Sequence, residues 1–149
     1  MTYDTIFGLL NASVVPAWAL LILLPRASIT RAVVHSGIYP LLLGVFYIIC
    51  FALNIFGDLA AEGGNFFTHE GISTLFSHPN GVLIGWSHYL VFDLFVGAWV
   101  ARDSQRRGIP HLAAIPCLLL TFIFGPVGLL CYILVRLAMG KGFGLNEDV

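Results

Sequence analysis

A histidine and an aspartate lie inside a long apolar stretch of this chain, between Trp86 and Phe95. A charged carboxylate near the middle of a membrane helix costs roughly 2.5–3.5 kcal/mol on insertion scales, so such residues usually face a bundle interior or a polar cavity. We therefore predict functional roles for Asp93 and His88. The alternative is that they form structural hydrogen bonds between helices.

The composition indicates a membrane protein. Of the 149 residues, 58% are hydrophobic and 10% are charged, whereas soluble domains carry about 25% charged residues. The net charge of −1 and the absence of a Lys/Arg-rich run give no reason to expect a nucleic-acid partner. Cys50, Cys117 and Cys131 lie in apolar runs without the Cys/His spacing of a zinc site. We expect no metal and, without a glycine-rich phosphate loop, no cofactor.

Four apolar segments are long enough to cross a bilayer, which takes about 20 residues. They cover about residues 5–24, 37–55, 81–100 and 110–137. We predict an all-α fold, a polytopic transmembrane four-helix bundle that forms a single integral membrane domain over residues 1–149. Proline inside the first and fourth segments predicts kinked helices there. For the fourth segment, a re-entrant hairpin with halves of about 13 residues is the alternative.

The basic residues predict which side of the membrane each loop faces. They follow the first and third segments: Arg26, Arg31, Arg102, Arg106 and Arg107. The loop 58–80 contains no Lys or Arg. The positive-inside rule then places the basic loops in the cytoplasm, and the loop 58–80 and the N-terminus on the other side. Four spans also place the C-terminus outside, together with Arg136 and Lys141, against the rule. We expect a multi-pass protein of a bacterial inner or photosynthetic membrane.

Helical periodicity gathers the polar residues on inward faces. At 100° per residue, one face of the second segment carries Tyr47, Phe51, Asn54 and Asp58. One face of the third carries Trp86, Tyr89 and Asp93, and His88 lies about 140° away, near Phe92. Aromatic walls with a few polar points predict a slot for a long apolar ligand. Aromatic packing of the core and of interfacial belts is the alternative.

The candidate residues fall into two groups. The catalytic candidates are Asp93, His88 and Asp58, and the substrate-binding candidates are Trp86, Tyr89, Asn54, Tyr47, Asn11, Phe92 and Thr121. The pair that Asp103 forms with Arg106 or Arg107, at i,i+3 and i,i+4, is interpreted instead as a solvated helix-end pair.

Three motifs carry a family resemblance. They are Trp86-x-His88-x-Leu90-x-x-Asp93-Leu94-Phe95, Asp103 ten residues after Asp93, and Phe124-x-Pro126-Val127-Gly128. With them the chain resembles, over about residues 5–138, the abscisic-acid-deficient-four-like membrane family, which includes a plant plastid protein tied to neoxanthin synthesis. That family commonly has an arginine five residues after the motif aspartate. This chain has Ala98 there, so no cation is carried over to that position.

The resemblance implies the opening of a carotenoid epoxide to an allenic alcohol. This redox-neutral isomerisation needs an acid at the oxygen and a base that removes a vinylic proton. A carboxylic acid desolvated among aromatic rings keeps its proton near neutral pH, so Asp93 is the acid candidate, His88 or Asp58 the base, and Tyr89 an orienting residue. We predict an isomerase of a carotenoid or related isoprenoid lipid. A non-catalytic carotenoid-binding or accessory protein and a small transporter are the alternatives, and a homo-oligomer is left open.

Overall fold

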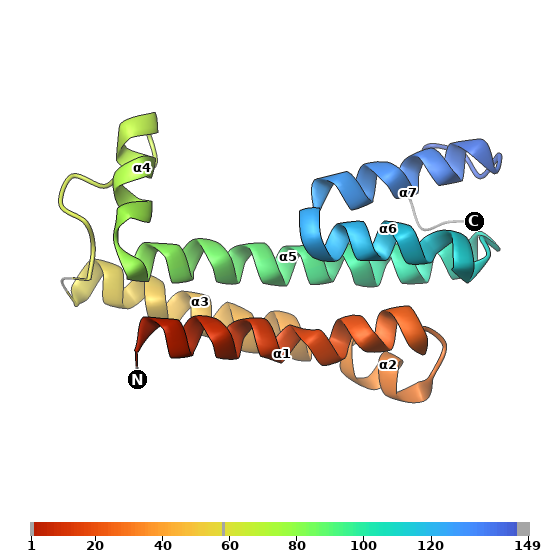
Figure 1. The fold of residues 1–149 in the computed structure, drawn as a ribbon, viewed down its shortest axis with the longest axis horizontal. Coiled ribbons are helices and arrows are strands. Elements are labelled where there is room, and N and C mark those ends of the chain that lie inside the picture. The colour runs from red at the N-terminus through yellow and green to blue at the C-terminus, as the bar shows by residue number, and fades with distance from the viewer. Residues whose placement is uncertain (1, 58, 146–149) are drawn as a thin grey trace. The chain divides into compact units, whose positions relative to one another are not determined.

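The structure is a computed structural model that describes residues 2–57 and 59–145. Within these ranges the chain forms only helices and their connections (Figure 1), which confirms the all-α prediction. The helices are α1 (Tyr3–Leu23), α2 (Ser28–Val33), α3 (Ile38–Phe56), α4 (His69–Ser77), α5 (Pro79–Arg106), α6 (His111–Phe124) and α7 (Pro126–Ala138). Asp58, a predicted catalytic residue, lies outside the described residues.

Three stretches of the described chain are long and apolar enough to cross a membrane. They are Tyr3–Leu23, Ser28–Phe56 and Pro79–Arg106, and they match the first three predicted segments. Helix α5 continues six residues past the predicted end at residue 100, because the charged residues after it still pair at helical spacing.

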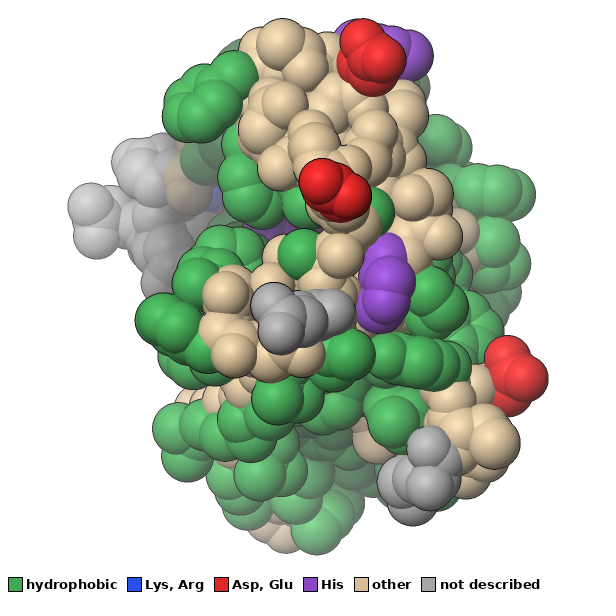
Figure 2. All heavy atoms as spheres, turned by 90° about the vertical axis from the view of Figure 1, so that its left-hand side faces the viewer, with side chains coloured by type: hydrophobic (Ala, Val, Ile, Leu, Met, Phe, Trp, Pro, Cys, Tyr) green, Lys and Arg blue, Asp and Glu red, His purple; other side chains and the backbone are tan. Residues whose placement is uncertain are grey.

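The chain divides into two compact units, which are described separately here. Unit 1 comprises Met1–Ser13 and Ile38–Val91, and unit 2 comprises Val14–Gly37 and Phe92–Val149. All seven Lys and Arg residues belong to unit 2 by sequence. On the face of unit 1 that α4 and the preceding segment form, acidic and histidine side chains stand among hydrophobic ones (Figure 2). Glu62, His69 and Glu70 are exposed.

In unit 1, α4 packs closely on the start of α5. The hydroxyl of Thr68 accepts a hydrogen bond from the backbone N–H of Gly71 and caps α4. Glycine on α5 permits the approach, since a Cβ at Gly81 would collide with the backbone of Leu75. The amide of Asn80 is buried and donates to the carbonyl of Cys50 at 2.9 Å, which fixes α5 to α3. These contacts hold three helices around one cavity.

In unit 2, the predicted fourth helix over 110–137 is two antiparallel helices, α6 and α7 (Figure 1). The chain reverses at Gly125, whose φ of 29° is a conformation that side chains disfavour, and Pro126 then starts α7. The two helices can meet closely because Gly128 has no side chain. A Cβ at this position would collide with the backbone of Thr121. A reversal at glycine followed by proline, rather than a kink, is the physical reason for the difference.

The hairpin returns the chain to the end of α5. The guanidinium of Arg107 donates to the carbonyl of Lys141 at 2.9 Å, and Arg136 approaches Asp103 at 3.4 Å. Helices of 14 and 13 residues are also shorter than the roughly 20 that a span requires. Arg136 and Lys141 therefore lie close to Asp103 and Arg107, whereas a single fourth helix would carry them to its far end.

Candidate functional site

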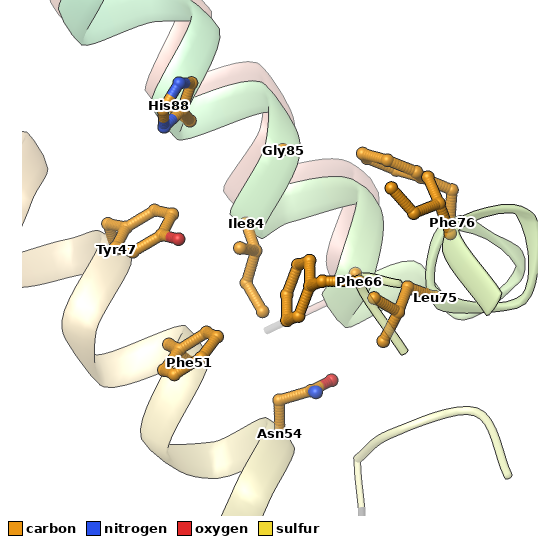
Figure 3. Close-up of a pocket in the computed structure, with 11 residues that line it drawn as sticks. Tyr47, Phe51, Asn54, Phe66, Leu75, Phe76, Ile84, Gly85 and His88 are labelled. Atoms are coloured by element: carbon orange, nitrogen blue, oxygen red, sulfur yellow. The ribbon is translucent and has the colours of Figure 1, made fainter. Parts of the chain in front are cut away.

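A pocket of about 290 Å³ lies in unit 1 between α3, α4 and α5. Figure 3 shows side chains of α3 facing those of α5, with residues of α4 and the segment before it on the third side. Its walls are formed by Tyr47, Phe51, Asn54, Phe66, Ile72, Leu75, Phe76, Gly81, Ile84, Gly85 and His88. The predicted seam of Tyr47, Phe51 and Asn54 on the second segment is thus one wall of this pocket.

Three polar side chains interrupt the apolar wall: Tyr47, Asn54 and His88. The rings of Tyr47 and His88 lie 6.2 Å apart between centroids, and Tyr47 stacks on Phe51 at 6.0 Å. Tyr47 and Asn54 are half-buried and His88 is exposed. The pocket therefore combines a large apolar surface with an imidazole, a phenol and an amide, which can donate or accept hydrogen bonds.

The size of the pocket decides what it can hold. Pockets for small molecules measure about 300–1,000 Å³, so a volume of about 290 Å³ suits one end of a long apolar ligand and leaves the rest of that ligand outside. Phe66 and Phe76 have 63% and 51% of their surface exposed, so apolar surface continues beyond the pocket.

The α4 side of the pocket was missed at the sequence level. Phe66 and the two α4 residues Leu75 and Phe76 fall in the stretch 58–80, which is predicted to be a loop. The available signal was the pair Gly81 and Gly85, four residues apart on α5. A Cβ at Gly85 would collide with the ring of Phe76, so these glycines mark a surface that another element approaches closely.

Three predicted substrate-binding residues form a second cluster in unit 1. The indole of Trp86 donates to the side-chain oxygen of Asn11 at 3.0 Å, and the amide of Asn11 donates to the carbonyl of Phe7 at 2.9 Å. The rings of Trp86 and Tyr89 stack at 5.0 Å. Asn11, Trp86 and Tyr89 are therefore brought together, but the bond between Trp86 and Asn11 joins α1 to α5, and none of the three residues lines the pocket.

Asp93 contacts the reversal between α6 and α7. It belongs to unit 2, where a Cβ at Gly125 would lie 2.8 Å from its Cγ and 2.9 Å from its Oδ2. Its side chain is half-buried, and Gly125 is the residue that precedes α7. The side chain of Asp93 therefore packs against the turn between α6 and α7, where the absence of a Cβ at Gly125 leaves room for it.

His88 and Asp93 point away from α5 in different directions. Five residues on a continuous helix correspond to about 140° around its axis. His88 lines the pocket in unit 1, whereas Asp93 is not among the residues that line it. Asp93 therefore remains a sequence-based candidate for acid catalysis, and His88 is the predicted catalytic residue that the pocket contains.

Two further substrate-binding predictions fall outside the pocket. Thr121 is fully buried in unit 2, where its hydroxyl donates to the carbonyl of Cys117 at 2.8 Å and its backbone faces Gly128. Phe92 has 56% of its surface exposed. Thr121 thus serves the packing of α6 on α7.

Unit 2 contains a buried ionic cluster around Asp103. Its carboxylate, fully buried, accepts hydrogen bonds from the hydroxyl of Tyr132 at 2.6 Å and from Nε of Arg107 at 2.9 Å. Arg136, also fully buried, donates to the carbonyl of Gly144 at 2.6 Å and lies over the ring of Trp99. The interpretation of Asp103 as a solvated helix-end residue is therefore wrong, because the α6–α7 hairpin covers it.

The sequence of the chain matches a known family. The model of ABA DEFICIENT 4-like proteins matches residues 5–132. This chain belongs to the ABA DEFICIENT 4-like family. The family resemblance predicted from the motifs on the third and fourth segments is thereby confirmed.

One relative of this family member is the protein ABA DEFICIENT 4, chloroplastic, of Arabidopsis thaliana. The two are 25% identical over 137 residues, which cover 89% of this chain and 61% of the plant protein. This ABA DEFICIENT 4-like chain therefore spans about three fifths of the length of its plant relative. No solved structure matches it.

Proposed function

We propose that the chain binds one end of a carotenoid or related isoprenoid lipid in the unit 1 pocket and isomerises it by proton transfer. The observation that carries the proposal is the pocket itself, an aromatic and aliphatic cavity with only three polar side chains on its wall. A long polyene with a polar ring at its end matches such a surface, because the apolar chain covers the aromatic rings and the polar atoms meet the polar groups.

Membership of the ABA DEFICIENT 4-like family supports this substrate class. The family is associated with carotenoid biosynthesis, at the formation of neoxanthin. The reaction proposed by analogy opens an epoxide to an allenic alcohol. The C–O bond breaks, the oxygen gains a proton, and a carbon of the polyene loses one. Protons and electrons therefore balance within the substrate and the protein groups that exchange protons with it.

His88 and Tyr47 are suited to these two proton transfers. His88 acts as the base that takes the proton from carbon, and the Tyr47 hydroxyl donates to the oxygen as the C–O bond breaks. The two residues come from α5 and α3, and their rings are close enough to reach neighbouring atoms of one ligand. Asn54 hydrogen-bonds a polar substituent at the ligand end.

Pigment analysis tests this proposal. A carotenoid-producing host that expresses the chain should accumulate a pigment with unchanged mass and a new retention time. His88→Gln should lower the initial rate by about 10²–10⁴-fold, the usual contribution of a general acid or base. His69→Gln is the matched control, because His69 is an exposed histidine of unit 1 outside the pocket. Equal rates for wild type and His88→Gln would contradict the catalytic role.

Carotenoid binding without catalysis is the second candidate. It is favoured by the predominance of apolar residues in the pocket wall. In that case a pigment co-purifies with wild type and with His88→Gln, and the pigment profile of the host does not change.

Asp93→Asn tests whether Asp93, the acid candidate from the sequence, donates a proton, because the amide keeps the shape of the side chain but cannot deliver a proton. Full turnover by purified Asp93→Asn would remove Asp93 from the mechanism.

The membrane arrangement belongs to the same proposal. Three spans followed by the α6–α7 hairpin place Ser28 and Glu62 on opposite sides, and Ser28 and Lys141 on the same side. Single cysteines at these three positions, labelled with an impermeant reagent in intact cells, measure this directly. The unsubstituted chain, which has three native cysteines, is the background control. Labelling of Ser28→Cys and Glu62→Cys from the same side would contradict the arrangement.

A further inference from the structure

A second pocket, of about 430 Å³, lies in unit 2 and is strongly basic. Four of the side chains that line the pocket are arginines, and no acidic residue is among them. The polar part of the wall is formed by Arg26, Arg31, Arg102, Arg106, His35 and Gln105. Hydrogen bonds fix the backbone around it, because Arg31 donates to the carbonyl of Arg26 at 2.9 Å and Gln105 donates to that of Pro25 at 3.3 Å. The arginines therefore converge on a cavity of defined shape.

His35 lines the same wall and contacts Arg102. Its Nδ1 lies 3.2 Å from the guanidinium of Arg102. Since arginine can only donate, Nδ1 is the acceptor and the ring proton of the neutral imidazole sits on Nε2. Nε2 is buried and has no hydrogen-bond partner within the part of the chain that the structure describes. The contact with His35 therefore fixes the guanidinium of Arg102 at the pocket wall.

The basic pocket lies where the apolar stretches end. Pro25 and Arg26 follow the stretch Tyr3–Leu23. Arg102 and Arg106 lie within the last five positions of the stretch Pro79–Arg106. Such positions correspond to the boundary between hydrocarbon and headgroups. An anion bound there can remain attached to an acyl chain that lies along the apolar helices.

We propose that the basic pocket binds the phosphate group of an anionic membrane lipid. Guanidinium groups match phosphate oxygens with paired hydrogen bonds. Arg106 shares its charge with Asp103 at 3.6 Å, whereas Arg26 and Arg31 are exposed and have no acidic partner among the described residues. The site is separate from the carotenoid pocket and does not depend on the function proposed for it.

Native mass spectrometry of the full chain in a neutral detergent tests the site. Phosphatidylglycerol and phosphatidylcholine with the same acyl chains are titrated separately, and inorganic phosphate is added as a competitor. Phosphatidylglycerol should bind at one saturable site and phosphatidylcholine should not. The double variant Arg26→Gln/Arg31→Gln should bind phosphatidylglycerol roughly 30-fold more weakly, since each arginine near a lipid surface contributes about a factor of five. Lys141→Gln, a cation of unit 2 outside this pocket, is the control.

The competitor distinguishes two sources of the phosphate group. Displacement of phosphatidylglycerol by inorganic phosphate supports a site that recognises the phosphate alone, and resistance to displacement supports recognition of the whole lipid. Binding of phosphatidylglycerol to wild type should also weaken as ionic strength rises, which tests the site without any variant. Equal binding of the two lipids, or equal binding to wild type and the double variant, would overturn the proposal.

Discussion

The two units use their polar side chains in opposite ways. In unit 1, the polar groups Tyr47, Asn54 and His88 line a cavity and keep part of their surface exposed. In unit 2, Asp103 and Arg136 are fully buried and bonded to one another or to the backbone. Unit 1 contains no Lys or Arg, whereas unit 2 contains every one.

This difference explains which polar residues are available for chemistry. A buried carboxylate that is shared by arginine and tyrosine is held in one geometry, and its lone pairs are already occupied. Polar groups on the wall of an apolar pocket can instead exchange their weak contacts for contacts with a ligand. The depth of burial of a charged residue in an apolar helix therefore does not identify a catalytic site without knowledge of its partners.

The largest expected effect on stability belongs to Asp103. Asp103→Asn leaves Arg107 and Arg136 without their carboxylate, and loss of one partner from a buried ion pair costs about 3–5 kcal/mol. Denaturation in mixed micelles, followed by tryptophan fluorescence, measures the loss. Glu62→Gln, an exposed acidic residue of unit 1, is the control and should change the free energy of unfolding little. A loss below about 1 kcal/mol for Asp103→Asn would mean that the ionic cluster is solvated.

Gly128→Ala should have the next largest effect, of about 1–3 kcal/mol, because overpacking displaces the neighbouring chain. The new methyl group would collide with the backbone of Thr121 and separate α6 from α7. Gly44→Ala in α3 of unit 1 is the matched control, since nothing lies within 4 Å of the position that its Cβ would take. The same denaturation assay applies. Equal stability of the two variants would show that close packing of the hairpin is not required.

Asn80→Ala probes how unit 1 is held together. Loss of the hydrogen bond to the carbonyl of Cys50 should cost about 1 kcal/mol. It should also weaken carotenoid binding, because α5 is then less firmly placed against α3. Pigment retention during purification and the denaturation midpoint measure the two effects. Ser73→Ala removes an exposed hydrogen bond on α4 and serves as the control. If Asn80→Ala retains as much pigment as wild type, the hydrogen bond between Asn80 and Cys50 is not required for the shape of the pocket.

The smallest effect is expected for Arg106→Gln. Its side chain is 30% exposed and lies 3.6 Å from Asp103, so the pair should contribute only about 0.3–0.5 kcal/mol. Together with Asp103→Asn, this variant separates the solvated edge of the ionic cluster from its buried centre. If Arg106→Gln destabilises the protein as much as Asp103→Asn does, the exposed edge of the cluster contributes as much to stability as its buried centre.

Helix type and the first three apolar stretches were predictable because composition and 3.6-residue periodicity act locally. The seam of Tyr47, Phe51 and Asn54 was found for the same reason. The α6–α7 reversal was weighed as an alternative but not chosen. Gly125 and Pro126 permit both a kink and a turn, and the choice depends on contacts such as that between Gly128 and Thr121.

Burial of Asp103 could not be derived from its own segment. At i,i+4 from Arg107 it has the pattern of a surface pair, and only the returning hairpin brings Tyr132 and Arg136 to it. The α4 wall of the pocket could not be predicted either, because Phe66 and Phe76 approach α3 and α5 only through tertiary contacts. Sequence periodicity identifies faces, whereas pairing of faces depends on the connections between them.

The short hairpin has a consequence for the surrounding lipid. At 1.5 Å per residue, α6 and α7 extend about 20 Å, less than the hydrocarbon thickness of about 30 Å. In the proposed membrane arrangement they enter from the face where α5 ends, so they would add protein cross-section to one leaflet and little to the other. The area occupied per leaflet then differs, so membranes whose two leaflets are packed at different lateral pressure should favour or oppose insertion of this chain. Gly125, by reversing the helix, thus couples the protein to the curvature of its bilayer.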